Sequence, residues 1–419
     1  MSKRSSKLME ISNMFDEINV DLNELNNKGI KDMITIIKKQ NDTRYQPNVR
    51  HKIEDIILIT LFGLLAKCNE WTEIELFAKK KEKWLKKYLE LPNGIPSHDT
   101  IQRVISILDP QSLYTDTINY LINKINLITV SNERDILSMD GKTTNGSKRT
   151  SGKNKEETVV NTMSIYSNNY GISLIQDYIT KKSNEIPMGP KLLEKLQLEG
   201  CIVTADALNT QVDTIKAILK GKADYVLPVK ENQLLTFTEI KEYFNDEKLY
   251  NEAKKENYLK VTSKEHNAII TREYCMTNDI KWMNKKEKWP GLKSIGLSKN
   301  TIEKEGNISI EIRYYIVSFS NDIDLFSKSV RNEWGIENNL HAPLDIVFRE
   351  DKNKTLEKNG AKNLGILRRI ALAILKFAQT YYKKSLNLIR TNLSFDFENE
   401  IETIFKLLDV DKINQMKNT

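Results

Sequence analysis

The amino-acid sequence predicts an α/β protein, in which an all-helical domain precedes a core built on a mixed sheet with flanking helices. Three observations predict this fold class. Apolar residues recur at helical spacing through the first third of the chain. From residue 136 short apolar strands replace that pattern, and strands then alternate with helices up to residue 230. Such alternation is typical of parallel strands with helices packed on the sheet.

The helical domain is expected to cover residues 32–126, after an N-terminal tail of residues 1–31. The apolar run Ile56–Ala66 is too short to span a bilayer and indicates a buried helix. An amphipathic helix is predicted in Trp71–Leu91, and Ser97 is a typical N-cap for the helix after it. These segments predict a compact helical unit.

The core is expected to cover residues 130–390. Its first strand is apolar over Ile136–Met139 and stops at Asp140–Gly141, and a hairpin is predicted at residues 159–180. The alternating segments that follow are a helix at 187–200, a strand at 201–205, a helix at 210–220 and a strand at 223–229.

Residues 235–327 lose this alternation and contain strand-like segments, which predicts a mainly β insertion. Two helices are expected after it. The second keeps apolar residues at strict helical spacing over Leu367–Tyr381, so it should be packed along its length. Residues 391–419 are expected to form a C-terminal helical tail.

The composition is that of a soluble globular chain, because 39% of the 419 residues are hydrophobic and 29% are charged. The N-terminus lacks the apolar segment of a signal peptide. The three cysteines are far apart and have no zinc-binding spacing, so a reducing cytoplasm is expected. The formal net charge of +7 fits a polyanionic partner or an ordinary lysine-rich surface.

Two aspartates share one sequence context. Asp140 follows the apolar run ILSM and Asp206 follows IVTA, so each is the first charged residue beyond a strand. In open sheets with parallel strands, active residues gather at the carboxyl ends of the strands. The alternative for each aspartate alone is an ordinary turn or helix-cap residue.

A third carboxylate, Glu337, lies on the apolar face of a helix predicted within Ser329–Asp351. The residues of that face are Val330, Trp334, Leu340, His341 and Leu344. Trp334 is expected in the core, and the alternative is a residue that stacks on a DNA base. A charge on an apolar face costs free energy unless it is paired or bound. The three carboxylates make an all-oxygen set that suits Mg²⁺ or Mn²⁺, and such ions support phosphoryl chemistry.

The chain resembles the DDE-class transposases of bacterial insertion sequences. The most similar group has a helical transposase-associated N-terminal domain and is related to the H-repeat-associated proteins of Rhs elements. The matching segments run in order along the chain and are VRHKIEDIILITLFG, LPNGIPSHDTIQRV, SMDGKTTNGS, KSNEIP, VTADALNTQ, ADYVLPVKENQ, WPGLKSI, VRNEWGIENNLHAPLDIVFRED and NLGILRRIALAILK.

The resemblance implies a ribonuclease-H-like catalytic core whose first and fourth strands are neighbours. By motif, Asp140, Asp206 and Glu337 are the expected catalytic residues and the expected ligands of Mg²⁺ (or Mn²⁺). The implied reaction is hydrolysis of a phosphodiester at a transposon end, followed by attack of the freed 3′-hydroxyl on target DNA. The implied partners are double-stranded DNA, at terminal inverted repeats and at the target, and a second subunit in a homodimeric synaptic complex. We expect the protein at the nucleoid in the cytoplasm, with no membrane partner.

Several polar residues near the three carboxylates are expected to bind DNA by charge or hydrogen bonds. They are Lys142, Lys148, Arg149, Lys230, Asn232, Arg331 and His341. The alternative for the loop residues is a solvated surface. His341 could also orient the carboxylate of Glu337 or be an ordinary packed histidine. Arg368 and Arg369 are expected to flank DNA or to lie on a solvated helix face.

The sequence departs from better-known relatives around the glutamate. Those relatives place Tyr and Arg seven and four residues before it and Lys seven residues after it. Here the positions hold Val330, Glu333 and Leu344, so the phosphate contacts of those relatives are not carried over. Two other functions remain open: a catalytically silent, transposon-derived DNA-binding protein, and a metal-dependent nuclease without strand transfer.

Overall fold

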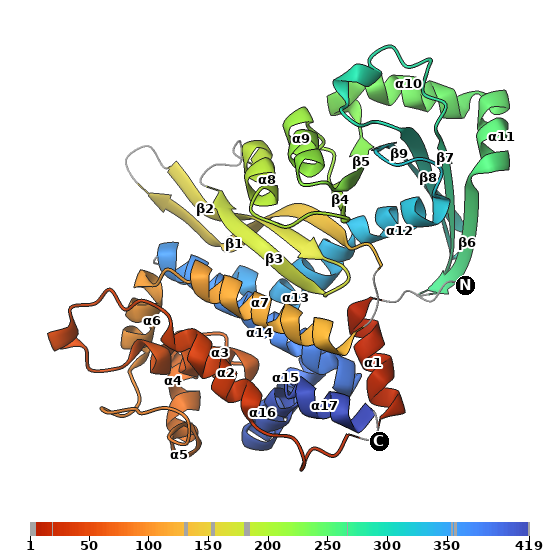
Figure 1. The fold of residues 1–419 in the computed structure, drawn as a ribbon. Coiled ribbons are helices and arrows are strands. Elements are labelled where there is room, and N and C mark those ends of the chain that lie inside the picture. The colour runs from red at the N-terminus through yellow and green to blue at the C-terminus, as the bar shows by residue number, and fades with distance from the viewer. Residues whose placement is uncertain are drawn as a thin grey trace.

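The computed structural model describes residues 6–18, 20–129, 133–151, 156–179, 185–265, 267–352, 355 and 358–417. Figure 1 shows a broad sheet with helices on it, above a thick helical layer. The first and last helices of the chain share this layer, so segments from the two ends of the sequence lie side by side.

Helices from both ends of the chain form the helical layer. From the first part they are α1 (Lys7–Glu17), α2 (Lys28–Lys38), α3 (Ile53–Leu65), α4 (Trp71–Lys80), α5 (Glu82–Leu85), α6 (His98–Ile107) and α7 (Gln111–Ile128). From the last part they are α14 (Lys358–Tyr382), α15 (Leu386–Phe395), α16 (Phe397–Lys406) and α17 (Val410–Lys417). The side chain of Ser97 caps α6 as its sequence position predicts.

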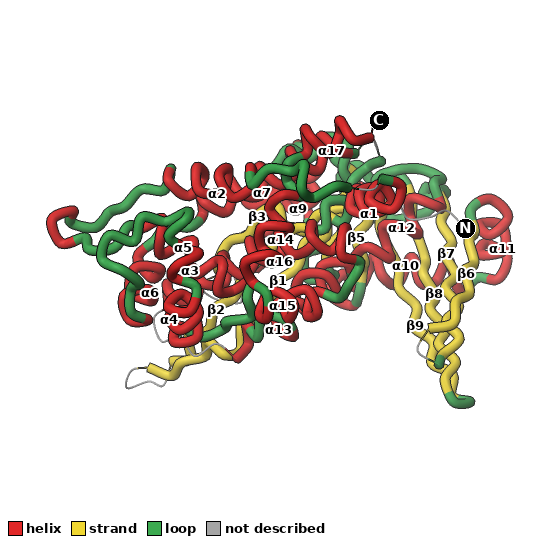
Figure 2. The backbone as a smooth tube through the Cα atoms, turned by 90° about the horizontal axis from the view of Figure 1, so that it is seen from below, coloured by secondary structure: helices red, strands yellow, loops and turns green. Residues whose placement is uncertain are grey.

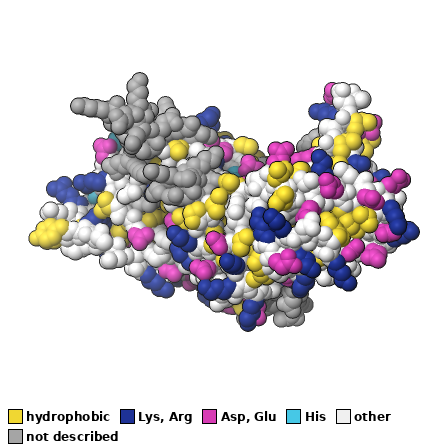
Figure 3. Space-filling model, turned by 90° about the horizontal axis from the view of Figure 1, so that it is seen from above, with side chains coloured by type: hydrophobic (Ala, Val, Ile, Leu, Met, Phe, Trp, Pro, Cys, Tyr) yellow, Lys and Arg dark blue, Asp and Glu magenta, His cyan; other side chains and the backbone are white. Residues whose placement is uncertain are grey.

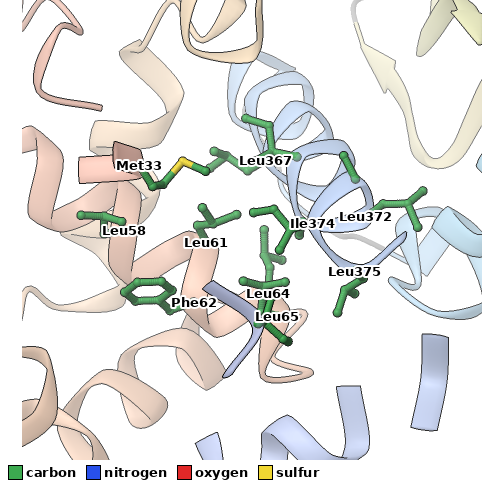
Figure 4. Close-up of a cluster of buried hydrophobic side chains, with 14 of the residues drawn as sticks. Met33, Leu58, Leu61, Phe62, Leu64, Leu65, Leu367, Leu372, Ile374 and Leu375 are labelled. Carbon is green, nitrogen blue, oxygen red and sulfur yellow. The ribbon is translucent and has the colours of Figure 1, made fainter. Parts of the chain in front are cut away.

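The core of this layer is built around α3, whose residues are apolar on nearly every side. Figure 4 shows leucines of α3, such as Leu61, against Met33 of α2 and Ile374 of α14. α16 packs on α2, and α17 packs on α7. The C-terminal helices therefore complete the core of the N-terminal ones, because both sets bury their apolar faces against each other.

The described strands form one mixed sheet in the order β3-β2-β1-β4-β5-β9-β8-β7-β6. Their bounds are β1 (Ile136–Ser151), β2 (Glu156–Ser167), β3 (Ile172–Ile179), β4 (Ile202–Ala205), β5 (Asp224–Val229), β6 (Tyr258–Glu265), β7 (Ala268–Thr277), β8 (Ser294–Lys304) and β9 (Asn307–Val317). β1, β4 and β5 are parallel to one another, and β2 is antiparallel to β1 and to β3. The first and fourth strands are neighbours, as expected for a ribonuclease-H-like core.

Helices cover both faces of the sheet. α8 (Glu185–Leu193) contacts β2 and β3, and α9 (Val212–Lys220) contacts β5 (Figure 1). α12 (Ile323–Glu333) lies on the other face against β1 and β4, and α7 and α14 pack there on β3. Ile136 belongs to the apolar cluster under α12, whereas Leu137 belongs to the cluster under α8 and α9. Alternate residues of β1 thus face α12.

The insertion extends the same sheet, because β9 pairs antiparallel with β5. It also contains two helices that the strand-like sequence pattern did not indicate, α10 (Leu234–Asn245) and α11 (Glu247–Glu256). They cover one face of its strands, and α12 covers the other. Figure 2 shows strands of β6–β9 running out from the body of the molecule as an arm, and Figure 3 shows hydrophobic and charged side chains on this arm.

Two sequence predictions near the carboxylates need correction. β1 does not stop at Asp140 but continues to Ser151, because β2 pairs with it beyond the point where β4 ends. The predicted continuous helix around Glu337 is divided: α12 ends at Glu333, a π-helical turn covers Glu337–His341, and α13 covers Ala342–Ile346.

Arg368 and Arg369 are neither DNA-facing nor solvated, as both are buried in α14. The helix is surrounded by other elements along its length, so its polar side chains must find partners inside. Arg369 pairs with the buried carboxylate of Glu350 at 2.9 Å, and Arg368 donates to the carbonyl of Asn69 at 3.3 Å.

Candidate active site

Asp140 and Asp206 follow paired positions of two parallel strands. Met139 of β1 pairs with Ala205, the last residue of β4, and each aspartate comes next in the chain. Neighbouring strands lie about 4.8 Å apart, so the backbones of the two aspartates adjoin. The structure therefore brings both predicted carboxylates to one edge of the sheet.

The side of the site that carries Asp206 is held by its own loop. Asp206 is exposed, and its Oδ1 accepts hydrogen bonds from the backbone N–H of Asn209 at 2.9 Å and from Nδ2 of Asn209 at 2.8 Å. Nδ2 of Asn232 donates to the carbonyl of Ala207 at 2.7 Å. Asn232, predicted to bind DNA, thus also fixes the loop behind the second carboxylate.

Glu337 reaches the same edge from the segment after α12. It begins the π-helical turn, a rare conformation that occurs frequently at functional sites. Oε2 of Glu337 lies 3.0 Å from Nδ1 of His341, and that nitrogen lies 3.5 Å from Oδ2 of Asp140. The imidazole is therefore placed between the first and third predicted carboxylates.

One face of β1 ties this segment in place at two points. Ser138, Asp140 and Lys142 alternate along the strand and face α12 and the turn after it. Oγ of Ser138 donates to the carbonyl of Asn332 at 2.7 Å. Nζ of Lys142 lies 2.7 and 2.6 Å from the two carboxylate oxygens of Asp345. The segment is thus bonded to β1 on both sides of the glutamate.

The imidazole of His341 is buried and neutral at physiological pH. Burial, helped by the positive charges of Arg369 and Lys142, lowers its pKa to about 3. Its Nε2 has no hydrogen-bond partner among the described residues. A direct contact with a DNA phosphate, as predicted, does not fit a residue that is 3% exposed. The alternative in which His341 orients the carboxylate of Glu337 fits the geometry.

The ligand atoms of Asp140, Glu337 and His341 lie within 4.8 Å of one another, so the described part of the chain contains a group able to hold a metal ion. Two carboxylate oxygens and one imidazole nitrogen suit a divalent ion. This group differs from the all-oxygen set that the sequence predicts. Asp206 is not one of its members, although its backbone adjoins that of Asp140.

Glu333 adds a further acidic group close to Asp206. Its carboxylate lies 3.7 Å from the guanidinium of Arg313 and accepts a hydrogen bond of 3.3 Å from the hydroxyl of Tyr315. Burial raises its pKa to about 7, against the opposing effects of Arg313 and Tyr315. The charge of Lys230 lowers this pKa and that of Asp206 raises it. Burial therefore favours the protonated form of Glu333.

The other predicted DNA-binding residues have different surroundings. Lys142 is buried in its ion pair with Asp345, so the structure gives its ammonium group a partner inside the protein. The side chains of Lys148 and Arg149 lie outside the described residues. Lys230 is exposed at the end of β5, where a phosphate could reach it.

A polar groove of about 400 Å³ lies beside the Glu337 segment. Arg331 lines it together with Arg272 and Arg313 of the insertion. Trp334 also lines it and is 50% exposed, so the prediction that it lies in the core is wrong. The guanidinium of Arg313 lies 4.8 Å from its ring centroid. Sequence reasoning missed the two insertion arginines, because only the folded sheet brings them here.

Comparison with known families tests the resemblance seen in the sequence motifs. Residues 131–374 match a family described as "Transposase DDE domain", and residues 34–121 match one described as "DDE_Tnp_1-associated". The first match covers more than half of the chain. The chain belongs to the DDE transposase family. The resemblance seen in the sequence motifs is therefore confirmed.

Relatives of this transposase-family chain include "Putative transposase YncI" of Escherichia coli O157:H7, which is 33% identical over 365 residues. That alignment covers 83% of this chain and 87% of the relative. "H repeat-associated putative transposase YhhI" of Escherichia coli K12 is 31% identical over 354 residues, covering 83% of this chain and 90% of the relative.

A solved structure described as a piggyBac transposase synaptic complex with hairpin DNA overlaps 95% of this chain and 81% of that chain. The identity is 12% and the TM-score is 0.41, so the likeness remains general. Among the described helices, none combines the length and the apolar character that crossing a membrane requires.

Proposed function

We propose that this chain is an active transposase of an insertion sequence. It would hydrolyse a phosphodiester at each transposon end and then join the freed 3′-hydroxyl to target DNA. The observation that carries the proposal is the meeting of Asp140, Asp206 and the Glu337 turn at one edge of the sheet. A family match alone would not require these three groups to meet.

The proposed catalytic residues and metal ligands are Asp140, Asp206 and Glu337. When bound, a divalent ion such as Mg²⁺ or Mn²⁺ supplies activation of the attacking oxygen and stabilisation of the leaving oxygen. The protein supplies orientation: β1 and β4 align the aspartates, and the ties of β1 to the α12–α13 segment fix the glutamate. No Ser or Tyr nucleophile is needed, because water and then a DNA 3′-hydroxyl are the attacking groups.

The proposed DNA path crosses this edge and the groove beside it. Lys230 at the end of β5 and Arg331 in the groove would contact phosphates, with Asn232 close to Lys230 in the chain. The path is identified by the positions of these residues beside the carboxylates. A homodimer that holds two transposon ends remains part of the proposal.

The test is DNA cleavage and joining by the purified full-length chain, with a duplex that carries the terminal inverted repeats of its element. Cleavage should require Mg²⁺ or Mn²⁺ and fall by about a thousandfold or more in Asp140→Asn, Asp206→Asn and Glu337→Gln. Asp213→Asn is the matched control, since Asp213 on α9 is an exposed aspartate outside the site. Wild-type activity in any of the three variants would contradict the assigned triad.

Joining separates the proposal from the two alternatives. Pre-cut ends with a free 3′-hydroxyl should be transferred into a target plasmid. Cleavage without transfer would assign a nuclease, and DNA binding without cleavage would assign a silent relative.

A further inference from the structure

We propose that His341 is a direct ligand, through Nδ1, of the divalent ion held by Asp140 and Glu337, and that this nitrogen makes the site prefer Mn²⁺ to Mg²⁺. The inference deepens the proposed function and rests on its metal site. It adds a ligand to the three carboxylates expected from the family resemblance. It also predicts which ion the site selects.

The distances match those within one coordination sphere. Nδ1 of His341 is 3.0 Å from Oε2 of Glu337 and 3.5 Å from Oδ2 of Asp140. Adjacent ligands of an octahedral ion with bonds of about 2.1 Å lie about 3.0 Å apart. An ion could therefore take all three atoms as ligands after small side-chain movements.

The backbone supports this placement. Glu337 and His341 are the first and last residues of the π-helical turn, and their side chains point to a common position. The pair Lys142–Asp345 follows the turn and draws it onto β1, which carries Asp140. His341 therefore needs no rearrangement of the backbone to act beside the two carboxylates.

The imidazole of His341 is shielded from solvent, and its Nδ1 faces two carboxylates. The side chain of His341 is 4% exposed, yet Nδ1 is directed at two carboxylates that are themselves 31% and 53% exposed. Nε2 finds no partner among the described residues. The polar contacts of the ring are therefore those of Nδ1, which faces the two carboxylates.

The donor set determines the preferred ion. Mg²⁺ favours oxygen ligands and keeps several of its waters, whereas a neutral imidazole nitrogen suits transition metals. A site with two carboxylate oxygens and one imidazole nitrogen should therefore bind Mn²⁺ more tightly than Mg²⁺. Replacing His341 by an oxygen ligand should weaken this preference.

The first experiment is pulsed electron paramagnetic resonance of Mn²⁺ added to the full-length protein without DNA. The wild type should show the coupling of a directly bound nitrogen, and ¹⁵N-histidine labelling should change that coupling. His341→Gln and His341→Asp should both lose it. His98→Gln is the control, because His98 on α6 already pairs with Glu75 and should leave the signal unchanged.

The second experiment measures Mn²⁺ and Mg²⁺ affinities by calorimetric titration of the same proteins. The ratio of the Mg²⁺ to the Mn²⁺ dissociation constant should fall by about tenfold in His341→Asp relative to the wild type. His341→Asp offers an oxygen ligand, so it should still bind an ion if it folds. The resonance measurement on the ¹⁵N-labelled wild type tests the nitrogen ligand even if neither His341 variant folds.

The outcomes separate the two proposals. Mn²⁺ binding without nitrogen coupling in the wild type would overturn the role of His341 and leave the carboxylate site intact. An unchanged coupling in His341→Gln would overturn it as well. Failure of the wild type to bind either ion would overturn both the further inference and the proposed metal-dependent function.

Discussion

The two sides of the candidate site are held by different kinds of contact. The Glu337 side depends on bonds between β1 and the α12–α13 segment, which join residues 194 and 203 positions apart in the sequence. The Asp206 side depends on bonds to Asn209, three positions away, and on the bond between Asn232 and Ala207, 25 positions apart. Long-range contacts form only when the whole core folds. The glutamate side should therefore be linked to global stability, and the Asp206 side should not.

The largest effect on stability is expected on the Glu337 side, at the ion pair Lys142–Asp345. Lys142→Met should lower the free energy of unfolding by about 3 kcal/mol, at the low end of the range for a buried pair, because the carboxylate left without its partner is only partly buried. Chemical denaturation measures the change.

Two further variants test the cause. Lys230→Met, a lysine change on the Asp206 side, should stay within about 0.5 kcal/mol of the wild type. The double variant Lys142→Met/Asp345→Leu should recover more than half of the loss, since both charges are gone. A loss below about 0.5 kcal/mol in Lys142→Met would show that this tie does not stabilise the fold.

A second effect depends on pH and concerns Glu333, which lies near Asp206. Its pKa rises from 4.5 to about 7 in the folded protein, so the folded state keeps a proton that the unfolded chain releases earlier. The free energy of unfolding should therefore fall as pH rises from about 4.5 to 7, by about 2 to 3 kcal/mol in total.

Glu333→Gln should remove this part of the pH dependence. The variant should match the wild type near pH 4 and be more stable than it at pH 8, as measured by denaturation at both values. A wild type and a variant with parallel pH profiles would mean that Glu333 stays ionised in the folded protein.

A smaller effect is expected at Ser138, the other tie of β1 to the glutamate segment. Its hydroxyl donates to the carbonyl of Asn332 and accepts a hydrogen bond of 2.8 Å from Nδ2 of Asn168. Ser138→Ala should cost about 1 to 2 kcal/mol, because two partly buried partners, the carbonyl of Asn332 and Nδ2 of Asn168, each lose a bond. Ser309→Ala on an exposed part of β9 is the control. Equal unfolding midpoints for the two variants would refute the tie at this position.

The smallest effect on stability is expected on the Asp206 side. Asn209→Ala should change the free energy of unfolding by less than about 1 kcal/mol, because the backbone N–H of residue 209 still bonds to Asp206. DNA cleavage should fall by about tenfold, because the carboxylate of Asp206 loses the bond from Nδ2 that helps to orient it. Denaturation and the cleavage assay are run on the same preparation. If stability falls as far as in Lys142→Met, the two sides are not held differently.

The sequence predicted the parts of the site that depend on local pattern. Asp140 and Asp206 stand at the ends of apolar strands, and that context predicted their shared edge. Glu337 was found from its place on an apolar helical face. The partner of Lys142 could not be predicted, since no local pattern links it to Asp345 across 203 positions.

Helical periodicity failed where the helix itself changes. The apolar arc assumed about 100° per residue through Trp334, whereas α12 ends at Glu333 and the chain then enters a π-helical turn. Trp334 therefore turns out into the groove, while Leu340 and Leu344 stay buried. The extension of β1 beyond Asp140 was missed for a related reason: its polar residues are held there by pairing with β2 rather than by an apolar face.

The pairing of β9 with β5 fixes where the insertion is attached to the core. The chain leaves the core after Val229 and returns as β9 alongside β5, so both attachment points are anchored to one strand. The far turn of the arm, Glu305 and Gly306, has left-handed φ angles of 52° and 79° and joins β8 to β9. Residues could be gained or lost at that turn without moving either anchor. The length of the arm can thus change at its far turn while the catalytic edge keeps its position.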